Sequence, residues 1–176
     1  MARYKKYSWA SSDGLQERIL DTALAVFREH GFSDSTMAHI VDAGDVSIGS
    51  IYHHFGGKDE LFTACYSRLR ATLRASIGLE PGDDMPPQEW EAKYLWAVWE
   101  NREACSVFLV WDGPAGFHPG AGILECYADI SVLTGRMLCA IMLEAMRIIT
   151  EDGADDVGRI IDGTVNLLGV VRAEEF

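Results

Sequence analysis

The chain has 176 residues, of which 48% are hydrophobic, and a formal net charge of −12. This length allows one or two small domains with hydrophobic cores of their own. No apolar run approaches the ~20 residues that cross a bilayer, which argues against a membrane-spanning helix. Because no apolar run follows the basic residues Arg3, Lys5 and Lys6, we also expect no secretion signal.

The acidic charge is unevenly distributed along the chain. Residues 1–76 contain nine Lys/Arg and nine Asp/Glu, whereas residues 77–176 contain six Lys/Arg and eighteen Asp/Glu. The second segment therefore accounts for the whole net charge. Since polyanions repel each other, the neutral first segment is the better suited of the two to a nucleic-acid partner.

Two helices are predicted before residue 45. The run from Asp13 to Gln16 has the pattern of a capping box, with Asp13 as N-cap and Gln16 reaching back. Apolar residues then recur at helical spacing up to Gly31, which is expected to end this helix: Leu20, Ala23, Leu24 and Phe27. Thr36 can cap a second, short helix from Met37 to Ala43, with Ile40 facing inward.

A third short helix is predicted after the turn formed by residues 44–46. Ser47 is its expected N-cap. Val46, Ile51 and Phe55 can face a core, and the other side chains are left outward: Ile48, Gly49, Ser50, Tyr52, His53 and His54. A helix of two turns is not stable alone, so its neighbours must hold it. A helix, a short helix, a turn and a second short helix form a helix-turn-helix, whose last helix enters the DNA major groove.

This segment resembles the DNA-binding domain of the tetracycline-repressor (TetR/AcrR) family of bacterial transcriptional regulators. The resemblance rests on residues 19–23, Phe27, residues 31–32, residues 35–37, Ile40, residues 46–47, Gly49, Tyr52, residues 54–55, Lys58 and Leu61. The family commonly has Gly where this chain has Asp45, and Asp tolerates the left-handed conformation at modest cost. We therefore expect the turn to be kept.

The predicted DNA contacts follow from the outward residues and the caps. Phosphate contacts are expected from Thr36, Tyr52, His54 and Lys58, and a phosphate or base-edge contact from His39. Ser50 and His53 are expected at base edges and Ile48 at a thymine methyl, while Gly49 permits close approach. The capping Ser47 is also expected among the DNA-binding residues. The arm with Arg3, Lys5 and Lys6 fits a DNA contact and a solvated tail equally well.

The rest of the chain is predicted to be helical, with an aromatic-rich part. A fourth helix starts at Lys58, and a breaker-rich link over residues 78–87 leads to a helix from Gln88 to about Asn101. That helix is apolar on more than one face, which is typical of a buried helix. Eight aromatic residues are candidates for a small-molecule site, with ordinary core as the alternative: Trp90, Tyr94, Trp96, Trp99, Phe108, Trp111, Phe117 and Tyr127.

Acidic residues lie close to these aromatics in the sequence. Most are expected to be solvated, but one or two turned inward would favour a cationic, planar effector: Glu91, Glu100, Glu103, Asp112 and Asp129. The family resemblance implies that this second domain holds the effector pocket.

The last two helices are expected from about Cys126 to Thr150 and from Asp155 to Arg172. The resemblance implies that they pair with the same helices of a second subunit, and the alternative is packing within one subunit alone. The predicted interface consists of apolar residues at helical spacing: Leu138, Ile141, Met142, Ala145, Ile149, Val157, Ile161 and Leu168.

Enzymatic and metal-binding classes are disfavoured by the motifs. His53 and His54 are adjacent instead of four residues apart, and the glycines form no phosphate-binding loop. No serine or cysteine lies in a nucleophile motif, and the four cysteines contain no CxxC pair. We therefore expect no cofactor, no metal and structural thiols.

These observations predict an all-α protein with two domains. Residues 1–57 would form the DNA-binding helix-turn-helix domain with its arm, and residues 58–176 the ligand-binding and dimerisation domain. The predicted function is a cytoplasmic, nucleoid-associated homodimeric regulator, a repressor that binds a palindromic operator and is released by a small aromatic or apolar effector. The alternative is a helical protein-interaction adaptor without specific DNA binding.

Overall fold

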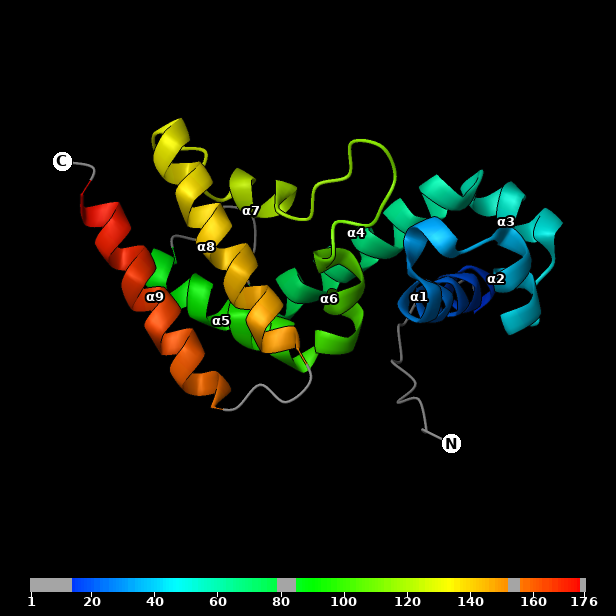
Figure 1. Cartoon of the computed structure of the whole chain (residues 1–176), viewed down its shortest axis with the longest axis horizontal. Coiled ribbons are helices and arrows are strands. Elements are labelled where there is room, and N and C mark those ends of the chain that lie inside the picture. Colours follow the sequence, from blue (N-terminus) through cyan, green and yellow to red (C-terminus); the bar gives the residue numbers. More distant parts are fainter. Residues whose placement is uncertain (1–13, 79–84, 152–155, 175–176) are drawn as a thin grey trace. The chain divides into compact units, whose positions relative to one another are not determined.

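The computed structural model describes residues 14–78, 85–151 and 156–174, and every regular element in these ranges is a helix (Figure 1). The all-α fold expected from the sequence is therefore confirmed. The chain divides into two compact units, Met1–Cys65 and Tyr66–Phe176. This division lies later than the expected one at residue 57, because the first turns of the fourth helix pack into the first unit.

The first unit contains α1 (Gly14–Asp34), α2 (Met37–Ala43), α3 (Ile48–Phe55) and the start of α4 (Lys58–Ile77). Its core is built around three phenylalanine rings. The ring centroid of Phe62 lies 5.2 Å from that of Phe27 and 4.9 Å from that of Phe32. Aliphatic side chains from all four helices complete this core and are fully buried: Ile19, Ile40, Ile51 and Leu61.

The regular first helix ends at Gly31, as predicted. Gly31 has a non-helical backbone, with φ 75 and ψ 170, and forms a kink after which a short helical segment continues to Asp34. The kink turns the following residue, Phe32, into the core. Of the predicted capping box, Asp13 lies outside the described residues. The side-chain amide Nε2 of Gln16 lies 3.1 Å from Nδ1 of His54, so Gln16 contacts α3.

The N-caps predicted for the two short helices are confirmed. The backbone N–H of His39 donates to Oγ1 of Thr36 at 3.1 Å, and the backbone N–H of Ser50 donates to Oγ of Ser47 at 3.0 Å. Each hydroxyl satisfies a backbone donor that lacks a partner within its helix. The starts of α2 and α3 are therefore set by local sequence.

The turn between α2 and α3 depends on Gly44. Asp45 does not have a positive φ, so the left-handed conformation allowed for it is not used. Gly44 has φ −124 and ψ 158, and a Cβ atom there would lie 2.6 Å from Oγ1 and 2.8 Å from Cγ2 of Thr22. The turn approaches α1 so closely that only glycine fits without displacement of a stiff, β-branched side chain.

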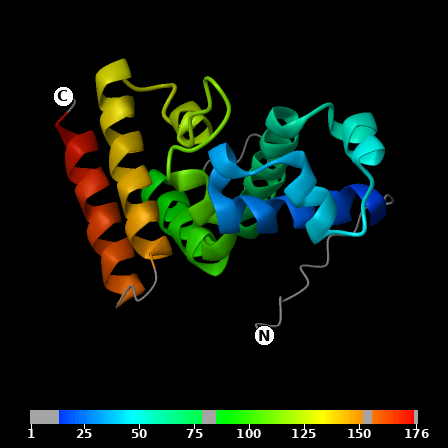
Figure 2. The same ribbon diagram turned by 45° about the vertical axis from the view of Figure 1, so that its right-hand side comes forward.

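The second unit contains the rest of α4 and five further helices: α5 (Pro87–Glu100), α6 (Arg102–Leu109), α7 (Ala121–Glu125), α8 (Val132–Thr150) and α9 (Val157–Ala173). Helix α8 contacts α5, α6, α7 and α9. Helices α8 and α9 lie side by side in both views (Figures 1 and 2). The fully buried Leu138 and Met142 place α8 at the centre of this unit's core.

The expected start of α8 near Cys126 is wrong. The helix begins at Val132, because the hydroxyl of Ser131 accepts a hydrogen bond from the backbone N–H of Thr134 at 3.2 Å and caps it there. The preceding apolar residues belong instead to α7 and to the turn after it. The expected burial of α5 on all sides is also wrong, since Trp96 is exposed.

The close approach at Gly44 generates a test of stability. Gly44→Ala should lower the free energy of unfolding of the first unit by ~1–3 kcal/mol, because the added methyl group overpacks against Thr22. Thr22→Ala should restore most of the loss in the double variant, because it removes the two nearest atoms. Thermal unfolding followed by circular dichroism measures both.

Gly49→Ala is the matched control for this test. A Cβ atom at Gly49 has Oγ of Ser47 as its nearest neighbour, at 3.8 Å, which is ordinary contact. This variant should keep its thermal stability. Equal destabilisation by the two substitutions would contradict the role assigned to the turn.

Candidate nucleic-acid interface

Helix α3 has one buried and one exposed face. Ile51 is fully buried, whereas Ile48 is 50% exposed and Tyr52 is 53% exposed. Gly49 and His53 are exposed as well. The division of this helix expected from its sequence is confirmed for these residues. An exposed apolar, aromatic and imidazole surface on an eight-residue helix is suited to contact with base edges and phosphates.

Two of the residues expected to face outward are half-buried and have partners within the protein. Oγ of Ser50 lies 2.8 Å from Oγ of Ser47. The Gln16 amide Nε2 donates a hydrogen bond to Nδ1 of the His54 ring, which ties α3 to α1. The His53 ring packs edge-on against His54 at 4.9 Å between centroids. The DNA contacts of Ser50, His53 and His54 stay predictions.

Lys58 has a structural role that the sequence did not indicate. Its ammonium donates to the backbone carbonyl of Phe32 at 2.8 Å and to that of Ser35 at 2.9 Å. It also lies 4.3 Å from the centroid of the Phe32 ring, a cation–π contact. Two of its three donors are therefore used after the kink of α1, and the phosphate contact expected of it stays a prediction. The Gly31 kink brings these carbonyls to the start of α4.

The exposed start of α2 carries a second imidazole surface. The ring of His39 lies 4.8 Å from the ring of His30, at an interplanar angle of 35°. Both side chains are exposed. His30 was not among the predicted DNA contacts, because nothing local in the sequence shows that the end of α1 lies beside α2. The signal that was available is the position of four of the five histidines between residues 30 and 54.

The eight candidate effector residues of the second unit do not form one cluster. Trp90 contacts Tyr94 and Tyr127, with ring centroids 6.3 Å and 5.5 Å apart. Phe108 and Phe117 share a second cluster with Tyr66, at 5.3 Å and 5.1 Å from it. The other three lie elsewhere: Trp96, Trp99 and Trp111. Part of the set therefore packs as ordinary hydrophobic core, which was the alternative to a small-molecule site.

One acidic side chain near the aromatics is turned inward. Glu91 is fully buried, and its Oε1 accepts hydrogen bonds from the Tyr127 hydroxyl at 2.8 Å and from the Arg172 guanidinium. Burial raises the pKa of Glu91, while the hydrogen bond from Tyr127 and the charge of Arg172 act in the opposite direction. The inward carboxylate is therefore compensated by a cation of the same chain, and it does not by itself call for a cationic effector.

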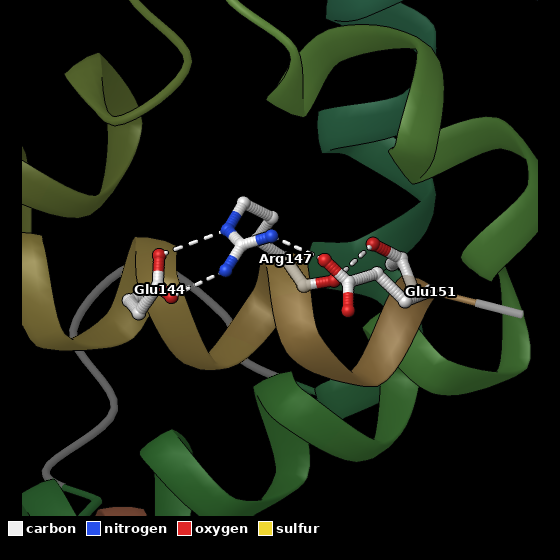
Figure 3. A network of polar contacts seen from close by, with 4 residues as sticks. Glu144, Arg147 and Glu151 are labelled. Carbon is white, nitrogen blue, oxygen red and sulfur yellow. Dashed lines mark hydrogen bonds and ion pairs between the residues drawn. The ribbon is translucent and has the colours of Figure 1, made fainter. Parts of the chain in front are cut away.

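Two surface hollows of the second unit, about 460 Å³ and about 200 Å³, share Leu109, Trp111 and Arg147. Of the eight candidate aromatics only Trp111 lines them, and it is 62% exposed. On α8, Arg147 lies between Glu144 and Glu151 (Figure 3), with Nη2 2.6 Å from Oε1 of Glu144. The hydrogen bonds from Arg147 lower the pKa of Glu144. This exposed network fixes three charges beside the hollows and contributes little to stability.

The apolar residues of α8 and α9 that were predicted at the interface lie mostly inside the subunit. Seven of the eight are buried within the subunit, because α8 and α9 pack against each other and against α5: Leu138, Met142, Ala145, Ile149, Val157, Ile161 and Leu168. The eighth, Ile141, is half-buried. These residues therefore belong to the subunit's own core.

A different set of apolar residues is exposed on the same two helices. Leu133 and Met137 on α8, and Leu167 and Val170 on α9, are exposed at spacings of three to four residues. Residues at such spacings share one face of a helix. Each helix thus presents a second apolar stripe outside the core, and an apolar stripe of this kind marks an interaction surface.

Three of the four cysteine thiols fit a structural role, and the fourth, Cys126, is exposed. Cys65, Cys105 and Cys139 are buried, and burial raises the pKa of the Cys105 thiol to about 12. A thiol with a raised pKa is a poor nucleophile and a poor metal ligand. In the described ranges, no three potential metal ligands come together, and no helix is long and apolar enough to cross a membrane.

Comparisons with known proteins identify the first unit as a DNA-binding domain, in agreement with its helix-turn-helix. Residues 19–65 match the family described as bacterial regulatory proteins, tetR family. The HTH-type transcriptional regulator SrpR of Pseudomonas putida is 32% identical over 83 residues, which are 47% of this chain and 38% of that protein. The HTH-type transcriptional repressor AcnR of Corynebacterium glutamicum is 41% identical over 67 residues, 38% of this chain and 35% of that protein. The chain thus spans less than two fifths of the length of these relatives.

Solved structures share the fold over both units. A TetR-like transcriptional regulator from Rhodococcus sp. RHA1 covers 93% of this chain and 99% of its own, with a TM-score of 0.67 at 21% identity. The fatty acid degradation regulator FadR from Bacillus halodurans covers 90% of this chain and 96% of its own, with a TM-score of 0.65 at 14% identity. The helix-turn-helix domain of this chain, with its capped and exposed α3, matches the DNA-binding domain of the tetR family of bacterial regulatory proteins.

Proposed function

We propose that this protein is a ligand-responsive transcriptional regulator that binds DNA through α3 and acts as a repressor in the cytoplasm. The observation that carries the proposal is the exposed face of α3, where Ile48, Tyr52 and His53 project from a helix held by the buried Ile51. The relatives named as regulators and repressors match this part of the chain. They support DNA binding over the adaptor function considered from the sequence.

Dimerisation is part of this proposal. A single α3 offers few contacts to DNA. When a dimer holds two DNA-binding units (heads) at a fixed separation, binding of the second becomes intramolecular, which increases affinity by ~10²–10⁴-fold. The exposed stripes with Leu133 and Met137 on α8 and Leu167 and Val170 on α9 are the proposed interface. A two-fold symmetric pair of heads would read a palindromic operator with half-sites about one helical turn apart.

The effector is proposed to be a small aromatic or apolar compound that binds the second unit. The supporting feature is the group of Trp90, Tyr94 and Tyr127, whose rings are in contact. The Tyr127 hydroxyl also donates to the buried Glu91, which is paired with Arg172. Release from DNA follows if such a compound binds more tightly to a conformation of the dimer whose heads do not fit successive grooves.

The first test separates base contacts from phosphate contacts. Ser50→Ala and His53→Ala should relax preference at individual operator positions by ~1–3 kcal/mol, because each would remove a base-edge contact. Tyr52→Phe should weaken operator and random duplex alike, because a phosphate contact has no sequence information. Operators selected from a random duplex pool and fluorescence anisotropy give both quantities.

Lys58→Ala is the structural comparison in this experiment. Because two backbone carbonyls lose their donor, this variant should lose thermal stability. Loss of base preference at single positions in Tyr52→Phe, with random-duplex affinity intact, would reverse the assigned roles. Absence of any salt-dependent duplex binding by the wild type would favour the adaptor function.

The second test separates the dimer interface from the core. Leu167→Glu places a charge in the exposed stripe of α9, and it should give a folded monomer that has lost operator binding. Ile161→Glu buries a charge inside the subunit and should unfold the second unit instead. Light scattering and circular dichroism distinguish the two outcomes. A Leu167→Glu protein that remains a dimer would show that the interface lies elsewhere.

The third test concerns the effector. An aromatic, weakly soluble compound from a small-molecule panel should quench tryptophan emission and release labelled operator. Trp90→Ala should weaken this response more than it weakens operator affinity, which is measured by anisotropy. An unchanged response across alanine variants of Trp90, Tyr94 and Tyr127 would show that these residues do not bind the effector.

A further inference from the structure

The helix-turn-helix of this protein lacks permanent cations. Residues 36–55 contain no Lys or Arg, and they contain Asp42 and Asp45. Over residues 14–65 the only Lys and Arg are Arg18, Arg28 and Lys58, against eight Asp and Glu. Because DNA affinity derives largely from cations that neutralise phosphates, a surface of this charge needs another source of positive charge.

Lys58 does not supply this charge to the surface. Its ammonium is held by the carbonyls of Phe32 and Ser35 and by the ring of Phe32. The arm with Arg3, Lys5 and Lys6 lies outside the described residues. The remaining groups of residues 14–65 that can become cationic near neutral pH are His30, His39, His53 and His54. Histidine is the side chain that ordinarily changes its charge between pH 5 and 8.

His30 and His39 are arranged as a pair. Their ring centroids lie 4.8 Å apart at an interplanar angle of 35°, and both side chains are exposed. They come from different helices, the end of α1 and the first turn of α2. The hydroxyl of Thr36 and the backbone N–H of His39 lie in the same turn of α2. Two neighbouring imidazoles repel each other when both are protonated, and an anion between them removes this repulsion.

We propose that His30 and His39 form one binding site for a DNA phosphodiester and that this site takes up a proton when DNA binds. This inference rests on the proposed DNA-binding function and adds a residue, His30, and a dependence on pH to it. A phosphodiester beside the rings stabilises the imidazolium, because an opposite charge at short range favours the charged form. Binding of the phosphodiester and binding of the proton therefore favour each other. Affinity rises as the pH falls through the range in which histidine side chains take up a proton.

The charged and titratable groups of α1 to α4 determine the electrostatic environment of the pair. On α1 and α2 these are Arg28, Glu29, Asp34 and Asp42, and the farther residues Glu17, Arg18 and Asp21 lie more than two turns before His30. On α3 they are Tyr52, His53 and His54, and on α4 Lys58, Asp59 and Glu60. Oε2 of Glu29 lies 4.0 Å from Nε2 of His30, but its side chain is 77% exposed, so solvent screens it strongly. The acids repel phosphate, so the protonated pair is what makes this surface attractive to DNA.

The experiment measures binding of the full-length protein to a fluorescent random-sequence duplex of about 30 base pairs, long enough for two half-sites. Affinity is measured at low salt at about pH 6 and about pH 8, where histidine is the side chain that titrates. Uptake of one proton by each DNA-binding unit increases affinity up to about tenfold per pH unit for one bound unit, and up to about a hundredfold when both units of a dimer are bound. Isothermal titration calorimetry in two buffers of different ionisation enthalpy counts the protons directly.

The variants assign the protons to the pair. In the double variant His30→Gln with His39→Gln, the pH dependence of affinity and the number of protons taken up should fall to a small fraction of the wild-type values. His39→Arg should bind tightly at both pH values with a reduced slope, because its charge is permanent. His118→Gln, which removes the fifth histidine in the second unit, is the matched control and should keep the wild-type slope. Circular dichroism melting confirms that each variant is folded.

Three results would overturn the inference. Salt-dependent duplex binding by the wild type with no pH slope would refute the proton-linked site and leave the DNA-binding function standing. A slope that survives in the double variant but is lost in His53→Gln would move the site to α3. Absence of duplex binding at both pH values would instead refute the proposed function and, with it, this site.

Discussion

The function depends on how a helix too short to be stable alone is held against α1. Helix α3 has eight residues, and a helix of this length needs tertiary contacts to exist in water. Its supports lie on its inner side and at its start: the buried Ile51, the Ser47 cap and the contact between His54 and Gln16. The glycine at residue 44 brings the whole turn close to α1. Because every support is on one side, the other side remains available to a partner.

Features that depend on a few neighbouring residues were predictable from the sequence. The caps at Thr36 and Ser47 and the bounds of α2 and α3 follow from hydrogen bonds over three residues. The bonds of Lys58 to carbonyls 26 and 23 residues earlier were not predictable, because a sequence does not show which segments meet. The same applies to the pairing of His30 with His39, which requires the angle between two helices.

The proposed dimer interface shows a second limit of prediction from sequence. Helical spacing correctly identifies apolar stripes on α8 and α9, but each helix has two such stripes, and only the fold shows which one is used inside the subunit. The stripe with Leu138 and Ile161 is buried there, and the stripe with Leu133 and Leu167 is exposed. The aromatics present a similar case, since the sequence cannot distinguish rings that pack on one another, such as Phe108 and Phe117, from rings that could surround a guest.

The ion pair between Glu91 and Arg172 has a consequence for the order in which the chain folds during synthesis. The contacts of the DNA-binding unit close within residues 14–65, so that unit can fold soon after it leaves the ribosome, as domains generally do from the N-terminus onward. The buried carboxylate of Glu91 on α5 pairs with Arg172, which lies 81 residues later in the chain, in the last turn of α9. Until that turn has emerged, Glu91 cannot be buried together with its cation. A nascent chain therefore has a folded DNA-binding head before it has a complete second unit.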